Sequence, residues 1–341
     1  MNTKEIRIMS NDDNPLGLKE VADILKSGGI VGIPTETVYG LAANAYDESA
    51  VAKIFEAKGR PQDNPLIVHI ADMNELDVIA AEIPKSAKKL AAAFWPGPLT
   101  MVLKRTEKIP ASVSAGLDTV AVRMPSNEVA RAIIEASGLP LAAPSANISG
   151  RPSPTTAKHV IDDLGGKIDA VVVSSECSVG VESTVISLVD GKNRLLRPGG
   201  ITHEQLESVI GPVEIDSSVL TSEVSSKVSS PGMKYKHYSP KTKVVIIEAD
   251  SNSFCDYVNR QSENYAAMCF SEEAAHINKK TITYGKMSDD MSQARELFDA
   301  LRVVDTLDVD VIFAHSPKKS GVGLAVYNRL LRAAAFEVIK L

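Results

Sequence analysis

Short apolar runs alternate with amphipathic segments over the first 215 residues of the chain. Runs rich in β-branched residues predict buried strands, and apolar residues at helical spacing predict helices. One helix has a natural N-cap at Asp47 and ends at Lys58-Gly59, and another follows a capping box formed by Thr202 and Gln205. This alternation predicts an α/β or α+β domain with a large sheet. The predicted strands are residues 30–33, 66–70, 99–103, 120–124, 139–143, 170–174 and 184–189, and the predicted helices are residues 18–26, 47–58, 85–94, 128–136 and 204–210.

A serine-rich stretch separates this part of the chain from a second one. Seven of the seventeen residues from Glu214 to Ser230 are serine, and no strong period survives there, so we predict a linker. After Lys243 a regular alternation of strands and helices predicts a small Rossmann-like three-layer domain. Its predicted strands are residues 244–248, 266–270 and 311–314. One helix is predicted to begin at Asp250, a second to span residues 294–304, and a third to begin at Gly321.

Composition and charge narrow the class of protein. With 341 residues, 44% of them hydrophobic and 23% charged, the chain has the composition of an ordinary soluble globular protein. Lys and Arg number 37 against 43 Asp and Glu, a net charge of -6, and no long basic arm indicates a permanent nucleic-acid-binding tail. The three cysteines show no C-x-x-C spacing, and no apolar run is long enough for a membrane span. We therefore expect a cytoplasmic protein without a disulfide framework, a thiolate zinc site or a membrane contact.

Common nucleotide-binding motifs are missing from the sequence. Gly166-Lys167 is followed by Ile168, which excludes a P-loop. The two glycines at 321 and 323 lack the third glycine of a dinucleotide fingerprint, because Val326 stands at that position. The six histidines show no metal-ligand spacing.

Polar residues gather where the predicted strands of the first domain end, which is where α/β sheets place binding residues. Three of the five clusters carry Arg or Lys, although this part of the chain has 21 basic and 27 acidic residues. A cationic cavity on an acidic domain suits an anionic ligand with phosphates. The clusters are residues 33–41, 58–65, 119–123, 143–147 extended by Gly150, Pro152 and Ser153, and 180–184 together with 197–200.

Each cluster taken alone also has a purely structural interpretation. Lys58 and Arg60 flank a glycine that could simply end a helix, and His69 could be a satisfied core histidine. Thr119 and Arg123 share one face of a strand otherwise built for burial. A guanidinium in that position needs an anion, which could be a carboxylate of the protein, a substrate carboxylate or a phosphate.

Taken in order, these clusters resemble the threonylcarbamoyl-AMP synthase family in its long, two-domain form. Each motif is weak alone, but the ordered set is specific and covers the whole chain. The motifs are PTETVYGL (34–41), K-x-R (58–60), NPL (64–66), FWPGPLT (94–100), VAVRMP (120–125), APSAN (143–147), ESTV (182–185), RPG (197–199) and PGMKYKHYSP (231–240).

The resemblance implies a domain organisation. Residues 1–215 would form a YrdC-like twisted open sheet with the active site in its concave face. Residues 243–341 would form a Rossmann-like accessory domain, and residues 216–242 a linker that lies over the active site. The basic stretch 231–243, with four lysines and two tyrosines, suits closure over phosphates or contact with RNA, although it could also be a solvated tether.

The resemblance also implies the reaction and its residues. The family joins L-threonine, bicarbonate and ATP into threonylcarbamoyl-AMP and pyrophosphate, and partner proteins use that intermediate to make threonylcarbamoyladenosine beside the anticodon of tRNAs. By resemblance, L-threonine would bind Thr37, His69, Arg123, Ala143 and Ser183. ATP would bind Lys58, Arg60, Asn64, Thr119, Ser145, Asn147, Ser153, Arg197 and Tyr238, with Lys58 and Arg60 carrying the catalysis.

The chemistry requires few other groups. Positioning and charge neutralisation can carry most of the catalysis, and Mg²⁺ is expected to be bound mainly by the ATP phosphates, because the sequence shows no dedicated carboxylate cage. An RNA-binding or ribosome-maturation module is the main alternative, and a carbamoyltransferase acting on a protein is a second one. The net charge argues against the first, and any direct tRNA contact would be weak.

Overall fold

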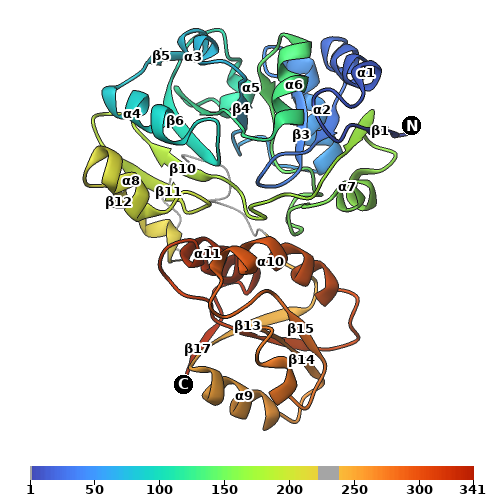
Figure 1. Cartoon of the computed structure of the whole chain (residues 1–341), viewed down its shortest axis with the longest axis vertical. Helices are drawn as coiled ribbons and strands as arrows, with labels where there is room; N and C mark the ends of the chain where they lie inside the picture. The colour runs from blue at the N-terminus through green and yellow to red at the C-terminus, as the bar shows by residue number, and fades with distance from the viewer. Residues whose placement is uncertain (1, 222–237) are drawn as a thin grey trace.

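Two sheets organise the chain in this computed structural model, which describes residues 2–221 and 238–341. Figure 1 shows them as two domains, with the smaller sheet below the larger one in that view. The strands of the larger sheet are β1 (Lys4–Arg7), β2 (Val31–Ile33), β3 (Gly40–Asn44), β4 (Ile67–His69), β5 (Ala80–Glu82), β6 (Leu99–Arg105), β7 (Thr119–Arg123), β8 (Leu141–Ala142), β9 (Ala170–Val173), β10 (Thr184–Ser187), β11 (Arg194–Arg197) and β12 (Glu214–Ile215). Those of the smaller sheet are β13 (Lys243–Glu248), β14 (Tyr265–Cys269), β15 (Thr281–Thr283), β16 (Val311–His315) and β17 (Val338–Lys340).

Helices cover both sheets. Among the described residues, no helix is long and apolar enough to cross a membrane. The α-helices are α1 (Pro15–Lys26), α2 (Glu48–Lys58), α3 (Met73–Ile79), α4 (Lys85–Phe94), α5 (Ala111–Ser114), α6 (Glu128–Ser137), α7 (Ala157–Leu164), α8 (His203–Ile210), α9 (Ser251–Asn259), α10 (Asp290–Val304) and α11 (Gly323–Ala333), and the 3₁₀ helices are η1 (Ser217–Val219) and η2 (Ala274–His276).

Local capping explains why several predicted helices are confirmed. The Asp47 carboxylate accepts hydrogen bonds from the main chain at the start of α2, and Gly59 ends that helix in the left-handed conformation at φ 59°. The predicted Thr202/Gln205 capping box starts α8. Helix α1 begins before the predicted residue 18, because Asn14 caps it and Pro15 occupies its first position. All seven strands predicted in this domain are also present, most of them shorter than predicted.

The elements missing from the prediction are short or have few large apolar residues. Strand β3 consists of small residues (GLAAN) and forms because it pairs antiparallel with β2. Strand β1 has one buried residue, Ile6, and pairs with β9 at the edge of the sheet. Such strands are stabilised by their neighbours, so periodicity alone does not reveal them. Helices α3, α5 and α7 and strands β5, β11 and β12 were also not predicted.

The large sheet is mixed, and its register brings distant residues together. The strand order is β1-β9-β2-β3-β8-β4-β7-β6-β10-β11-β12, with β5 pairing β6. Strands β4 and β7 run parallel with His69 opposite Arg123, and β6 places Thr100 opposite Arg123 on the other side. His69 and Arg123, which come from distant parts of the sequence, are therefore neighbours at one end of the sheet.

The second domain is the predicted Rossmann-like three-layer domain. Its five strands are all parallel, in the order β15-β14-β16-β13-β17. Helices α10 and α11 lie on the face toward the first domain, and α9 lies on the opposite face (Figure 1). The helices predicted at 250, 294–304 and 321 are present, whereas β15 and β17 were not predicted.

The two domains share an apolar cluster. Val38 and Val181 of the first domain pack in the same cluster as Tyr238 and the buried residues of α10 and α11. The two domains therefore meet through a packed interface.

The predicted linker contains described secondary structure at its N-terminal end. Strand β12 ends at Ile215 and pairs with β11, and the short helix η1 follows within residues 217–219. Helix η1 contacts the second domain, because Asn328 Nδ2 donates to the Val219 carbonyl at 2.7 Å. Residues 222–237, which hold most of the basic stretch and the predicted cover of the active site, lie outside the described residues.

Gly180 gives a direct test of the interface. Its φ is +84°, and a Cβ there would lie 2.3 Å from Cα of Arg295 in α10, whereas Gly191 has φ +69° and nothing within 4 Å of a Cβ. Both Gly180→Ala and Gly191→Ala place alanine in the left-handed region, at a cost of about 1 kcal/mol. We expect Gly180→Ala to lose about 2 kcal/mol more through overpacking. Calorimetry would show a clearly lower Tm for Gly180→Ala, and equal Tm values would contradict the packed interface.

Candidate active site

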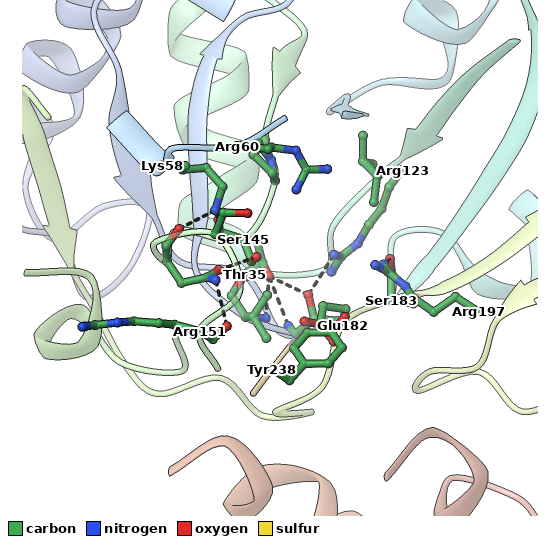
Figure 2. Close-up of a pocket in the computed structure, with 18 of the residues that line it drawn as sticks. Thr35, Lys58, Arg60, Arg123, Ser145, Arg151, Glu182, Ser183, Arg197 and Tyr238 are labelled. Atoms are coloured by element: carbon green, nitrogen blue, oxygen red, sulfur yellow. Dashed lines mark hydrogen bonds between the residues drawn. The ribbon is translucent and has the colours of Figure 1, made fainter. Parts of the chain in front are cut away.

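A polar pocket lies at the ends of several strands of the large sheet, next to the second domain (Figure 2). The structure brings together in it all the residues predicted for L-threonine: Thr37, His69, Arg123, Ala143 and Ser183. It also brings in most of the residues predicted for ATP: Lys58, Arg60, Ser145, Asn147, Arg197 and Tyr238. Clusters predicted separately along the sequence thus form one cavity.

Three predicted ATP residues do not line the pocket. Thr119 is the first residue of β7 and Arg123 the last, so the two are about 13 Å apart along the strand although they share a face. Ser153 is fully buried behind the pocket wall, where its hydroxyl donates to Glu182 at 2.5 Å. Asn64 is buried, and within residues 2–221 and 238–341 its side-chain oxygen has no hydrogen-bond partner. Their roles in ATP binding stay predictions.

Several lining residues were not predicted as site residues. Most of them belong to the motifs quoted above, so their position beside a predicted residue could have revealed them. Glu182 and Arg151 are the charged ones, and neither charge was expected in the pocket. The lining residues not predicted are Thr35, Val38, Gly40, Ile67, Pro144, Ser149, Gly150, Arg151 and Glu182.

Arg123 has a protein carboxylate beside it. Its guanidinium lies 2.7 Å from Oε1 of Glu36 and donates to the Thr37 hydroxyl at 2.8 Å. Arg123 and Glu36 are both buried, and Arg123 lowers the pKa of the Glu36 carboxyl despite the opposing effect of burial. Of the anions that the strand position allowed, the structure supplies Glu36. The guanidinium still faces the pocket, where a second anion can reach it (Figure 2).

His69 is held as a neutral base at the end of β4. It is 3% exposed, and burial followed by the charge of Arg123 lowers the pKa of its imidazole to about 3. Its Nδ1 atom is buried and has no hydrogen-bond partner among the residues that the structure describes. A neutral imidazole that lines a pocket with an unpartnered nitrogen is suited to a hydrogen bond from or to a polar ligand.

Lys58 ends α2 and reaches across the pocket. Its Nζ atom donates to the main-chain carbonyl groups of Ser145 and Asn147, at 2.5 Å each. The side chain is 1% exposed, and burial, reinforced by the charge of Arg60, holds its pKa well below the ordinary value. Gly59 does end the helix, as the structural interpretation required, but the lysine side chain bonds to another loop. An anion beside Lys58 would favour its charged form.

A second cationic group lies at the opposite wall. The Arg197 guanidinium donates to the carbonyl oxygen of Ser183 at 3.0 Å and to its hydroxyl at 3.1 Å. The Ser183 hydroxyl also lies 2.7 Å from Oγ1 of Thr100. Burial lowers the pKa of Arg197 to about 10, so the guanidinium stays charged at neutral pH. Arg197 thus fixes Ser183 and leaves positive charge at the pocket.

The pocket is therefore polar and cationic, and the carboxylates beside it are paired, Glu36 with Arg123 and Glu182 with Arg329 of α11. Lys58, Arg60, Arg123, Arg151 and Arg197 all line it. Among the described residues no group of His, Cys, Asp and Glu side chains could hold a metal ion. Such a pocket can bind a polyanion and a small carboxylate side by side.

Comparison with known families shows which proteins this chain is similar to. Residues 23–199 match a family model described as telomere recombination, and residues 201–335 match the C-terminal domain of threonylcarbamoyl-AMP synthase. The chain belongs to the threonylcarbamoyl-AMP synthase family. The expected family and enzyme class are confirmed.

Full-length relatives support this membership. The threonylcarbamoyl-AMP synthase of Pyrococcus abyssi is 48% identical over 334 residues, which cover 95% of both chains. That of Bacillus subtilis is 45% identical over 328 residues, 95% of this chain and 94% of the relative. A crystal structure of P. abyssi Sua5 complexed with L-threonine superposes with a TM-score of 0.92 at 42% identity, over 100% of both chains. This likeness confirms the expected two-domain fold of the family.

The buried His69 generates a pH prediction. Its folded-state pKa of about 3 lies below the unfolded value of about 6.5, so folding favours the neutral ring. The stability from neutral His69 is complete above about pH 6.5 and is lost as the pH falls toward the folded-state pKa. We expect nitrogen NMR of the ring to show no titration between about pH 8 and about pH 4, with His69→Gln assigning the signal. Titration near pH 6.5 would contradict this environment.

Proposed function

We propose that the chain condenses L-threonine, bicarbonate and ATP to threonylcarbamoyl-AMP and pyrophosphate. The observation that carries the proposal is the meeting of Arg123 and His69 with Lys58, Arg60 and Arg197 in one pocket. A carboxylate-binding end beside a phosphate-binding end is what this condensation needs. The L-threonine bound to the P. abyssi relative supports the same assignment.

The amino acid would bind at the Arg123 end. Its carboxylate would lie against the Arg123 guanidinium, which already contacts Glu36 and has further donors. The unpartnered nitrogen of His69 and the hydroxyl groups of Thr37 and Ser183 would meet its polar groups. The small side chain of Ala143 would leave space for the substrate.

The nucleotide would bind with its phosphates between Lys58, Arg60 and Arg197. Ser145 and Asn147 belong to one loop, in which the serine hydroxyl donates to Oδ1 of Asn147 at 2.6 Å. Lys58 also bonds that loop, so phosphate binding and loop position are coupled. Tyr238 lies at the second-domain side of the pocket, with its ring 5.2 Å from that of Phe298. Asn64, Thr119 and Ser153 would act from outside the pocket lining.

The chemistry would proceed by nucleophilic attack at phosphorus. The threonine amine attacks CO₂ derived from bicarbonate and loses a proton, forming a carbamate. A carbamate oxygen then attacks the α-phosphorus of ATP, and pyrophosphate leaves with the electron pair of the broken P–O bond. Lys58 and Arg60 would neutralise charge that develops on the phosphates, so no single general base is required.

Mg²⁺ would enter the pocket bound to ATP. Both carboxylates beside the pocket are engaged, Glu36 with Arg123 and Glu182 with Arg329, so neither is a free metal ligand. The phosphate oxygens of ATP would supply most of its ligands.

The product would act elsewhere. We propose that threonylcarbamoyl-AMP diffuses in the cytoplasm to proteins that transfer its threonylcarbamoyl group to tRNA. The net charge of -6 supports this indirect link to RNA over a direct one.

Substrate dependence is the decisive assay. We expect the full chain to form threonylcarbamoyl-AMP, and to release pyrophosphate from ATP, only when both L-threonine and bicarbonate are present. Mass spectrometry of the product and a pyrophosphate assay would measure this. Pyrophosphate release without L-threonine, or RNA binding without any product, would refute the proposal.

Two cations should be essential to turnover. We expect Lys58→Ala and Arg60→Ala each to lower kcat/KM at least about 100-fold, the range of a lost electrostatic contact to the transition state. Lys53→Ala is the matched control, because Lys53 is on the same helix but bonds the Gly28 carbonyl at 2.6 Å, away from the pocket. Circular dichroism would check the fold. Wild-type turnover in either pocket variant would disprove its role.

A further inference from the structure

One buried side chain of the second domain reaches the wall of the active-site pocket. Arg329 lies in α11 and is 0% exposed. Its Nε atom is 2.9 Å from Oε2 of Glu182, a residue that lines the pocket. A fully buried guanidinium is stable only when an anion compensates its charge and acceptors bind its N–H groups. The contact with Glu182 is therefore required at the domain interface.

Two further hydrogen bonds of Arg329 hold the same wall, and a third goes to the side chain of the neighbouring Asn328. Nη1 donates to the Pro198 carbonyl at 2.6 Å, directly after Arg197, and Nη2 donates to the main-chain carbonyl of Glu182 at 3.3 Å. The guanidinium carbon also lies 6.0 Å from the centre of the Tyr238 ring. One side chain therefore touches three segments of the chain that meet at the pocket.

Glu182 connects Arg329 to Ser153, a residue predicted to bind ATP. Its second oxygen accepts the hydrogen bond from Ser153 at 2.5 Å. Arg329 and Arg197 both lower the pKa of the Glu182 carboxyl and outweigh the effect of burial, so Glu182 is a carboxylate that needs these cations. Without Arg329 the Glu182 carboxylate would still be buried and charged, but it would have lost one of its two cationic partners.

A second arginine of the same domain supports the neighbouring loop. Arg302 of α10 binds the fully buried carboxylate of Asp163 at 2.9 Å and donates to the Pro152 carbonyl at 2.6 Å. Asp163 in turn holds the pocket residue Arg151 at 3.0 Å. The segment between Arg151 and Ser153 is thus tied to the second domain on both sides.

We propose that Arg329 is a positioning residue that makes the second domain part of the nucleotide side of the active site. It acts through Glu182 and Pro198, which set the positions of Ser153 and Arg197. This inference rests on the proposed function, because it uses the assignment of those residues to ATP. The threonine side depends on it less, since His69 and Arg123 are held in the paired strands β4 and β7, and Ser183 also bonds Thr100.

The test compares Arg329→Met with the double variant Arg329→Met/Glu182→Gln in the full chain. The double variant removes the Glu182 charge together with that of Arg329, so it keeps the fold if the single variant loses it through the unpaired carboxylate. We expect both to raise KM for ATP at least tenfold and KM for L-threonine less than threefold. Arg260→Met is the matched control, because Arg260 is an exposed arginine of α9's C-terminal end, and it should behave as wild type.

Two results would overturn the proposal: a wild-type KM for ATP in the double variant, or an equal rise of both KM values, as a general structural defect would produce. Calorimetric binding of α,β-methylene-ATP separates this claim from the proposed function. If the wild-type chain forms no product, the proposed function fails. At least tenfold weaker analogue binding by the double variant would still support the positioning role, and unchanged binding would refute it.

Discussion

Burying several positive charges around one small pocket is the constraint on which the rest of this structure depends. A buried cation without compensation costs several kcal/mol. For Lys58 the compensation comes from main-chain carbonyl groups of the 145–147 loop, and for Arg197 largely from the carbonyl and hydroxyl of Ser183. Carbonyl groups carry partial rather than full negative charge, so the pocket stays attractive to an anionic substrate.

Each of the two carboxylates beside the pocket compensates the charge of a buried arginine. Glu36 pairs with Arg123 within the first domain, whereas Glu182 pairs with Arg329 across the domain interface. The second pair lies in the interface where the two domains pack, which also holds the apolar cluster that includes Val38 and Val181. Helix α11 of the Rossmann-like domain therefore contacts the pocket residue Glu182, and α10 reaches the pocket residue Arg151 through Asp163.

Local signals predicted the elements whose causes are local. Asp47 and Gly59 delimit α2, and the capping box at Thr202 starts α8, because these bonds form between residues close in sequence. The edge strand β1 and the small-residue strand β3 escaped prediction because each is stabilised by a partner strand. The same difference separates the confirmed helices of the second domain from β15 and β17, which were not predicted.

The sequence by itself determined the family, the two-domain organisation and most residues of the pocket, because the ordered motifs carry the chemical groups that the site needs. Only the tertiary structure decided which charges meet. It paired Arg123 with Glu36, placed Thr119 away from the pocket lining and brought Arg329 to Glu182 across 147 positions of the chain. Motifs record which groups are present, whereas burial and strand register determine their partners, and both arise only when distant segments pack together.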